Sequence, residues 1–397
     1  MEVYLARQPV FNRNMKVFGY QLNYKRNPSS FLAGIDDQQT KAKLVSDAFL
    51  AAKLDILTGS GKALIDFTEE LLEQEIPLLL PRNTVIVEIP GDIKPTSILI
   101  SKCEKIKKYG YTMALNGNVF QEEYIPLFPL ADIIKIDISS IPINKQTMLI
   151  RGFQGKIKFL ADKVDTWPDY EKAAHLGYHY FQGEFFYKPV LAKSERKSGL
   201  NPNLIKVINE LNQEEPDYQL ISDIIEQDAS LSNQVIKMAN SPISRPQQEI
   251  YSTKQALIRL GLNEIRRWIY VLVLDECRKN HINELITSSL VRARLMETLA
   301  NDLGMRKRRF ELFILGLFYS MEAIMKKPMQ EILEEIPLST EVKEALLGKE
   351  NQLSRVLNWI LAYEKGSFDE LDRGGITLDK GEIVNLLIDS LEWVNSI

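Results

Sequence analysis

Polar side chains follow a series of short apolar runs in the first half of the chain. They are Asp66, Glu88, Asn116, Asp162 and Gln182, with Lys135 and Asp137 inside one further run. Carboxylate and amide oxygens bind divalent cations, and a lysine ammonium attracts phosphate. Taken singly, an Asp or Asn at a strand end is explained by its exposure to water. Lys135 and Asp137 interrupt an apolar run, and that explanation does not cover them.

The apolar runs are typical of buried β-strands. They span residues 63–67, 85–89, 111–115, 133–138, 157–161 and 178–182. Helix-like segments such as residues 97–109 and 170–176 lie between them, and this alternation predicts a parallel sheet with crossover helices. Residues 3–6 and 17–24 flank Asn12-Arg13-Asn14 and predict a hairpin ahead of the sheet. In an α/β barrel the strand ends meet on one face, which would bring the polar residues together.

The strand pattern stops after Pro189, and helical periodicity takes over. Stretches such as residues 254–260 and 264–278 predict an all-α second half. Residues 188–203 are charged, contain a Gly and two Pro and lack an apolar stripe, which indicates a joint. We therefore expect a first domain over residues 1–190, a linker over 191–201 and a helical domain over 202–397.

Composition and charge exclude several partners. The net charge of −4 gives no signal for polyanion binding, so nucleic acid is not an expected partner. Apolar runs such as residues 269–274 are far shorter than the roughly 20 residues that span a bilayer. The first residues lack the basic and apolar regions of a secretory signal. We expect no membrane association and a cytoplasmic location.

Four segments of the first half resemble the EAL phosphodiesterase family in the form that is fused to HDOD domains. They are YLARQPVFNRNMKVFGYQLNYKR, VIVEI, ADIIKIDIS and LADKVDTWPDYEKAAHLGYHYFQGEFFYKP. The resemblance covers residues 1 to about 190 and implies a TIM-like (β/α)8 barrel. In that family the barrel cleaves cyclic di-GMP with two metal ions, which are held by carboxylates and an asparagine.

This sequence departs from the family pattern at two places where the resemblance puts metal ligands. Gln21-Leu22-Asn23 stands where the family has Glu-Ala-Leu, so the first ligand has no charge. Asn116-Gly117 stands where the family has an Asp-Asp pair. A hard divalent cation is held more tightly by carboxylates than by amides, so both changes weaken metal binding.

Other positions keep charge or fit the family pattern. Asp66 replaces an Asn, and Asp162 begins a segment, Asp162-Lys163-Val164-Asp165, that replaces Glu-Gly-Val-Glu. The residues that fit directly are Glu88, Lys135, Asp137 and Gln182. We therefore expect a vestigial or ligand-binding site that comprises Gln21, Asp66, Glu88, Asn116, Gly117, Lys135, Asp137, Asp162 and Gln182.

The second half resembles HDOD domains, most clearly in LISDIIEQDASLSNQVIKMANSPIS and STKQALIRLGLNEIRRWI. This resemblance implies a relative of metal-dependent HD phosphohydrolases that has lost the metal-binding His and Asp residues. The half contains a single histidine, His281, and one imidazole cannot build a His-rich metal centre. We expect this domain to bind a signalling protein whose identity the sequence does not give.

These observations together lead to a functional expectation with two alternatives. The expectation is a non-enzymatic bacterial signalling protein with a degenerate EAL barrel, no catalytic residues and no metal or other cofactor. One alternative is a cyclic di-GMP receptor without turnover. The other is an active cyclic di-GMP phosphodiesterase, for which Mg²⁺ or Mn²⁺ would be required, because two-metal hydrolysis needs ions on both the attacking and the leaving oxygen.

Overall fold

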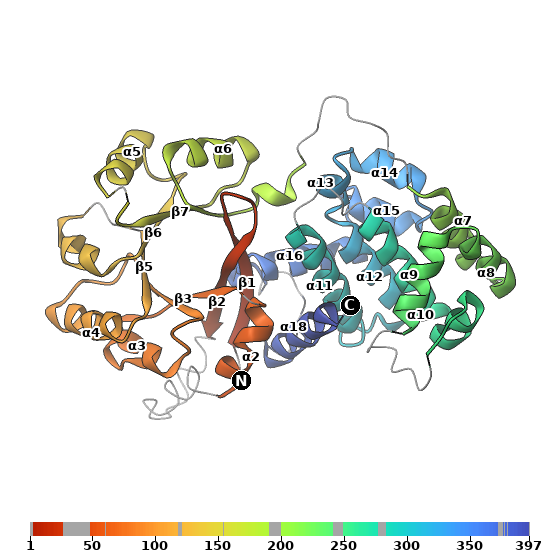
Figure 1. The fold of residues 1–397 in the computed structure, drawn as a ribbon, viewed down its shortest axis with the longest axis horizontal. Helices are drawn as coiled ribbons and strands as arrows, with labels where there is room; N and C mark the ends of the chain where they lie inside the picture. Colours follow the sequence, from red (N-terminus) through yellow and green to blue (C-terminus); the bar gives the residue numbers. More distant parts are fainter. Residues whose placement is uncertain are drawn as a thin grey trace. The chain divides into compact units, whose positions relative to one another are not determined.

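The computed structural model describes residues 3–26, 48–59, 61–117, 121–153, 155–189, 200–240, 249–276, 283–371, 376, 378 and 380–396. The chain divides into two compact units (Figure 1). The first comprises Met1–Lys188, Ala362–Leu371 and Asp379–Val384. The second comprises Pro189–Leu361, Asp372–Leu378 and Asn385–Ile397. The first unit therefore contains two short segments that come from late in the chain.

The first unit is built on a closed eight-stranded barrel in which the strands follow one another in chain order. The strands are β1 (Val3–Asn12), β2 (Val17–Arg26), β3 (Lys62–Asp66), β4 (Val85–Ile89), β5 (Thr112–Asn116), β6 (Ile133–Asp137), β7 (Lys158–Asp162) and β8 (Tyr180–Gln182). β1 is antiparallel to both β2 and β8, and all other neighbours are parallel. The predicted hairpin, parallel strands and TIM-like barrel are confirmed, with β1 as the one reversed strand.

A layer of apolar side chains fills the barrel. Seven strands each contribute one buried residue to it, and Phe18 of β2 packs against them. The seven are Val10, Leu64, Ile86, Ala114, Ile133, Leu160 and Tyr180. A barrel of this size is closed by such side chains and is not a pore. This layer therefore forms the floor of the barrel opening at the carboxyl ends of the parallel strands.

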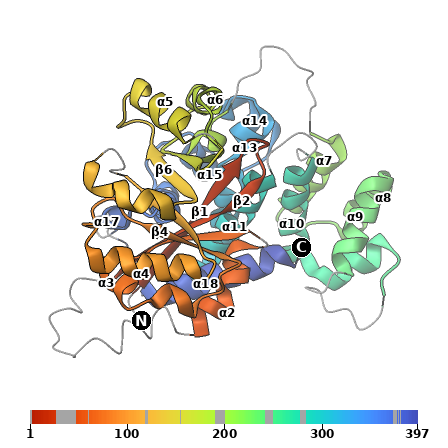
Figure 2. The same ribbon diagram turned by 60° about the vertical axis from the view of Figure 1, so that its left-hand side comes forward.

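Helices cover the outside of the parallel strands (Figures 1 and 2). They are α2 (Ala48–Thr58), α3 (Glu69–Glu73), η2 (Ile76–Leu79), α4 (Ser97–Lys108), η3 (Glu122–Leu130), α5 (Ile143–Gly152), α6 (Trp167–Leu176) and η4 (Phe185–Tyr187). The hydroxyls of Thr68, Thr96 and Thr166 accept a hydrogen bond from a backbone N–H in the first turn of α3, α4 and α6. Such N-caps fix where each helix begins, and so fix the length of the loop after the preceding strand.

The second unit consists of helices in the part that the structure describes. They are α7 (Pro202–Leu211), α8 (Tyr218–Glu226), α9 (Ala229–Ala239), α10 (Thr253–Glu276), α11 (Asn283–Leu299), η7 (Arg306–Arg308), α12 (Arg309–Phe318), α13 (Met321–Met325), α14 (Met329–Glu335) and α15 (Thr340–Leu346). α7, α8, α9 and α10 pack against one another (Figure 2). Gly261, with φ 72° and ψ 162°, breaks α10 between the two helices that the sequence predicts there.

The last helices divide between the units. α16 (Gln352–Glu364) belongs to the second unit as far as Leu361 and to the first from Ala362 onward, and α17 (Phe368–Leu371) belongs to the first. α18 (Lys380–Asn395) contributes its first residues to the first unit and the remainder to the second. Among the described residues, no helix combines the length and the apolar character that crossing a membrane requires.

Candidate active site

A polar layer lies directly above the apolar layer of the barrel. Side chains at positions i and i+2 of a strand share one face, so the residue two positions after each apolar contributor also points inward. On the parallel strands these residues are Asp66, Glu88, Asn116, Lys135, Asp162 and Gln182. β1 runs the other way, so its equivalent residue lies two positions before Val10 and is Gln8. The alternation of the strands alone therefore gathers these six predicted residues and Gln8 at one end of the barrel.

Lys135 lies at the centre of this layer. Its Nζ donates to Gln21 Oε1 at 3.0 Å and lies 3.2 Å from Glu88 Oε1 and 3.8 Å from Asp162 Oδ2. The lysine side chain is 5% exposed and that of Glu88 is 0% exposed. Burial would lower the pKa of Lys135, but the carboxylates of Glu88, Asp162 and Asp66 outweigh that effect and raise the pKa. The ammonium is therefore a fixed positive charge inside the barrel.

Asp66 is the carboxyl group that the surroundings perturb most strongly. Burial, and then the nearby charge of Glu88, raise the pKa of Asp66 to about 7. Gln21 Nε2 lies 3.4 Å from Asp66 Oδ2. Asp66 Oδ1 and Glu88 Oε2 are buried and have no hydrogen-bond partner among the described residues. Buried polar atoms are normally paired, so these two oxygens are suited to accept a cation or a hydrogen-bond donor.

Gln182 and Gln8 form a second part of the layer. Gln182 is buried, and its Nε2 donates to Gln8 Oε1 at 2.9 Å. Gln182 Oε1 is buried and has no hydrogen-bond partner in the described part of the chain. Gln8 was absent from the set predicted from the sequence. The alternation of inward and outward side chains along β1 could have identified Gln8. It lies two positions before Val10, toward the polar end of the barrel, because β1 runs in the opposite direction to the other strands.

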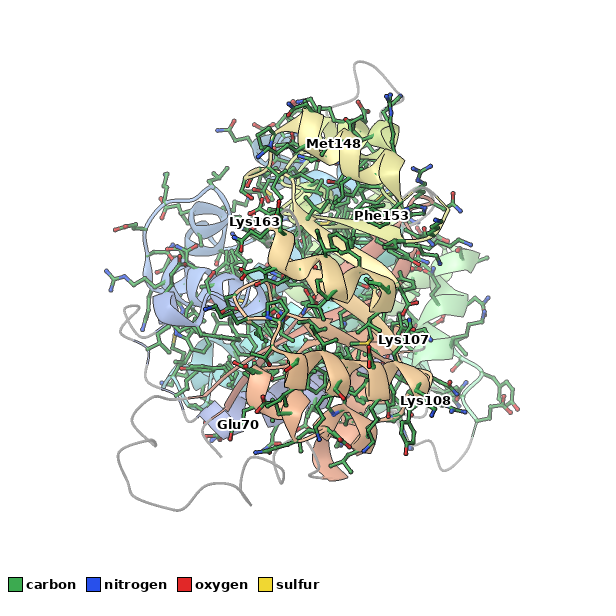
Figure 3. All side chains as sticks on the ribbon, turned by 90° about the vertical axis from the view of Figure 1, so that its left-hand side faces the viewer. Glu70, Lys107, Lys108, Met148, Phe153 and Lys163 are labelled. Carbon is green, nitrogen blue, oxygen red and sulfur yellow. The ribbon has the colours of Figure 1, made fainter. Side chains whose placement is uncertain are left out.

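Three predicted residues lie at the edge of the cluster. Asn116 is half-buried and stands beside Lys135 in the register of β5 and β6. Gly117 follows with φ +84°, and a Cβ there would lie 3.2 Å from Gly91 Cα, so its role is that of a turn residue. Asp137 Oδ2 lies 2.7 Å from Lys163 Nζ, which projects from the loop after β7 (Figure 3).

Asp137 is paired with neighbouring residues at the end of β6 and does not contact Lys135 in any described hydrogen bond or ion pair. Burial would raise the pKa of Asp137, but the hydrogen bonds from Lys163 and Ser139 outweigh burial and lower it. Asp137 Oδ1 also accepts a hydrogen bond from the Ser139 hydroxyl at 2.6 Å. Asp137 is therefore ionised and already paired.

The oxygen donors fit a divalent cation in their chemistry. Mg²⁺ and Mn²⁺ prefer carboxylate, amide and water oxygens, and the unpaired oxygens of Asp66 and Glu88 are of this kind. Across the described ranges, no three His, Cys, Asp or Glu side chains are arranged as a metal-binding group. His281, the one histidine of the helical half, lies outside the described residues. Two carboxylates are better suited to binding one metal ion than to binding two metal ions.

Comparison with known proteins places the chain in a family. Residues 200–356 match the HDOD domain family. The whole chain is 35% identical to the uncharacterized protein YuxH of Bacillus subtilis (strain 168), over 100% of this chain and 99% of YuxH. The chain is an EAL–HDOD protein of the same family as YuxH.

Two further proteins match this EAL–HDOD protein. CdgJ of Vibrio cholerae serotype O1, named a cyclic di-GMP phosphodiesterase, is 28% identical over 99% of this chain and 93% of its own. The crystal structure of an EAL domain protein from Listeria monocytogenes EGD-e matches with 18% identity and a TM-score of 0.38. That match covers 47% of this chain and 87% of the Listeria chain.

The comparison with CdgJ corrects one expectation. The sequence of the EAL–HDOD protein predicted that it is not an enzyme, and a full-length relative that is named a phosphodiesterase contradicts this. The prediction gave most weight to the charges lost at Gln21 and Asn116. It gave too little weight to the carboxylates that remain, because Asp66 and Glu88 present buried oxygens without a hydrogen-bond partner among the described residues, beside Lys135.

Proposed function

We propose that this protein is a cyclic di-GMP phosphodiesterase of a bacterial signalling pathway, and that its barrel binds and cleaves the dinucleotide at the polar end. The observation that carries the proposal is the pair of unpaired carboxylate oxygens, Asp66 Oδ1 and Glu88 Oε2, beside the buried ammonium of Lys135. The name of CdgJ supports the same substrate. Hydrolysis adds one water across one phosphodiester bond and yields the linear dinucleotide.

The residues of the polar layer have separate roles in this proposal. Asp66 and Glu88 would hold one divalent cation through their unpaired oxygens. When bound, such an ion lowers the pKa of a coordinated water and offsets phosphate charge. Lys135 supplies a second, fixed positive charge that stabilises the negative charge of the phosphate in the transition state. The apolar layer below keeps bulk water out of the barrel floor.

The amide groups at the mouth complete the proposal. Gln21 accepts a hydrogen bond from Lys135 and so holds the ammonium in the centre of the layer. Gln182 presents a buried, unpaired oxygen that can accept a hydrogen bond from the ligand. A guanine base carries N–H donors, including its exocyclic amino group. The site therefore has groups for both the phosphate and the base of the substrate.

The experiment is product analysis on the purified full-length protein. Cyclic di-GMP is incubated with Mg²⁺ or with Mn²⁺, and the linear dinucleotide is quantified by chromatography. CdgJ serves as the positive control, and Glu88→Gln as the variant that should lose at least tenfold in rate. If neither ion gives product while CdgJ is active under the same conditions, the proposal is wrong.

We also propose that the helical unit binds a signalling protein. The support is a cavity of about 420 Å³ that is lined largely by apolar side chains. Its lining includes Tyr270, Phe310, Ile314, Leu338 and Val342. A surface that buries apolar and aromatic groups is typical of a protein-binding site.

The partner proposal is tested by crosslinking in cells that contain the protein. Leu338→Asp places a charge at the half-buried edge of the cavity and should abolish the crosslinked partner. Leu347→Asp introduces the same charge at an exposed leucine outside the lining and serves as the control. Equal crosslinking by both variants and by the original protein contradicts the proposal.

A further inference from the structure

The segment Ala362–Leu371 packs against the first strand of the barrel and belongs to the barrel unit. The hydroxyl of Tyr363, a residue that is 1% exposed, donates to the carbonyl of Leu5. Phe368 stacks on Tyr4 with ring centroids 5.2 Å apart and planes within 7°. Lys365 Nζ lies 2.6 Å from Glu184 Oε1, just after β8. Contacts to β1 and to the loop after β8 therefore hold this segment in place.

The end of α16 presents a backbone carbonyl of this segment to the barrel. Ser367 N–H donates to Ala362 O, and Gly366 N–H donates to Tyr363 O, with Gly366 at φ +71°. This pair of bonds is a Schellman motif, which ends a helix at its left-handed glycine. The carbonyl of Lys365 lies at the C-cap and accepts a hydrogen bond from Gln8 Nε2 at 3.0 Å instead. The segment thus meets the barrel through a backbone acceptor.

This acceptor decides how two glutamine amides are oriented. A carbonyl can only accept, so Gln8 must turn its NH₂ group toward Lys365 and its Oε1 toward Gln182. Gln182 must then donate with its own NH₂, which leaves its Oε1 as the free group. The orientation of an amide in a structure is fixed by its network of hydrogen bonds, and here the network starts at Lys365.

We infer that the backbone carbonyl of Lys365, held in place by Tyr363 and Phe368, orients the barrel site. Gln8 is the positioning residue that accepts this constraint and fixes the orientation of the Gln182 amide. The inference rests on the proposed function for its ligand, a cyclic dinucleotide whose base offers an N–H donor. With the network in place, Gln182 presents an acceptor to that donor. Without it, the Gln182 amide is free to turn its NH₂ group toward the ligand and repel the donor.

A double-mutant cycle on the full-length protein tests this role through the dissociation constant for cyclic di-GMP, measured by calorimetry with Ca²⁺ present. Gln8→Leu removes both hydrogen bonds and should raise the dissociation constant about tenfold. Gln8→Glu offers Gln182 an acceptor whichever way it turns, so it should bind within about twofold of the original protein.

The second arm of the cycle loosens the segment. Tyr363→Phe removes the hydroxyl bonded to Leu5, and Phe368→Ala removes the ring stacked on Tyr4. Either change should weaken binding about fivefold in the Gln8 protein and less than twofold in the Gln8→Glu protein. Tyr363→Phe is the milder change and serves if Phe368→Ala fails to fold. Glu370→Gln, at an exposed position of the same segment, should leave the dissociation constant for cyclic di-GMP unchanged. Equal weakening in both backgrounds would overturn the inference.

Hydrogen exchange separates failure of the inference from failure of the proposed function. Without nucleotide, peptides that cover residues 362–371 should exchange several-fold faster in Gln8→Leu than in the original protein or in Glu370→Gln. If the original protein does not bind cyclic di-GMP, the proposed function is wrong, and the exchange result alone decides the inference. If Gln8→Leu leaves the exchange of these peptides unchanged, the segment is not coupled to Gln8 and the inference is wrong.

Discussion

Asp66 and Glu88 stand directly beside each other in the register of β3 and β4, and each carries a buried carboxylate oxygen without a hydrogen-bond partner in the described structure. Two acids placed in this way resist being ionised together, and the raised pKa of Asp66, about 7, follows from burial and from the charge of Glu88. The ammonium of Lys135 neutralises one of the two negative charges. The other carboxylate can bind either a proton or a metal ion. Most of the following predictions depend on which of the two it binds.

Asp66→Asn should stabilise the protein at pH 8 and have a much smaller effect at pH 5. The folded carboxyl has a pKa of about 7 against an ordinary 3.8, so the stability that its protonated form contributes is lost progressively between about pH 4 and pH 7. The asparagine amide does not titrate, so its contribution to stability does not fall with pH. At pH 8 the variant should exceed the original protein in free energy of unfolding by on the order of 2 kcal/mol. Urea unfolding with a chelator present measures it. Asp55→Asn, at an exposed position of α2, is the control, and equal effects of Asp66→Asn at both pH values would contradict the prediction.

Metal binding should strengthen as pH rises through 7. A cation at Asp66 must displace the proton, so its apparent affinity should be about tenfold weaker at pH 6 than at pH 8. Calorimetric titration with Mn²⁺ checks this. In Asp66→Asn the remaining affinity should be low and should lose this pH dependence. An affinity of the original protein that is the same at both pH values would place the ion elsewhere.

Gln21→Glu should increase both metal affinity and phosphodiesterase rate by tenfold or more. Gln21 is buried, accepts from Lys135 and lies beside Asp66, so a carboxylate there adds a charged ligand at the same position. In the absence of metal the same change should cost about 1 to 3 kcal/mol of stability, because it adds a buried acid to a cluster that already holds Asp66, Glu88 and Asp162. Gln121→Glu adds the same charge at an exposed position and should change neither the metal affinity and rate nor the stability. Unchanged turnover in Gln21→Glu would show that this position does not limit catalysis.

Lys135→Met should destabilise the barrel by roughly 3 kcal/mol at pH 8. The change leaves Glu88 buried without its ammonium partner, and breaking a buried ion pair from one side is costly. Lys163→Met removes a lysine that is 62% exposed and should cost less than about 1 kcal/mol. Chemical denaturation of both variants gives the comparison. Similar losses for the two would mean that Lys135 is not the electrostatic centre of the layer.

In the helical unit, Glu297→Gln should cost about 3 kcal/mol. Glu297 is 4% exposed, contacts the guanidinium of Arg267 through Oε1 and lies 3.0 Å from Arg294 Nη1 through Oε2. The substitution keeps the shape of the side chain and leaves the buried Arg267 with one ion pair fewer. Glu344→Gln, which breaks a more exposed pair with Lys349, is the control. Thermal unfolding of the full-length protein should separate the two variants by several degrees.

The sequence was sufficient for the barrel and for most of its polar layer. Asp66, Glu88, Asp162 and Gln182 were found because each comes at the end of a short apolar run, and Lys135 was found because it interrupts one. Strand alternation then places these residues on one inner face. The break of α10 at Gly261 was also found, because the helical pattern lapses there. Local periodicity carries this information, and no tertiary contact is needed to read it.

Gln8 and the segment Ala362–Leu371 were missed for a different reason. Gln8 lies at the polar end of the barrel only because β1 runs antiparallel to both of its neighbours, and closure of the barrel by β8 is a property of the whole fold. Tyr363 and Phe368 look like ordinary apolar positions of a helix, and nothing near them in sequence indicates a contact with Tyr4 or Leu5. Pairings between such distant positions leave no local pattern.

The hydrogen bond between Tyr363 and Leu5 joins residues 358 positions apart. During synthesis β1 leaves the ribosome early, while its partners in the segment emerge much later. Domains generally fold in the order in which they are made, but this barrel has to wait with Tyr4 and the Leu5 carbonyl uncovered until residues 362–371 have been synthesised. Premature termination anywhere in the helical half should therefore yield a barrel with an exposed aromatic edge, which would be a substrate for proteases and chaperones.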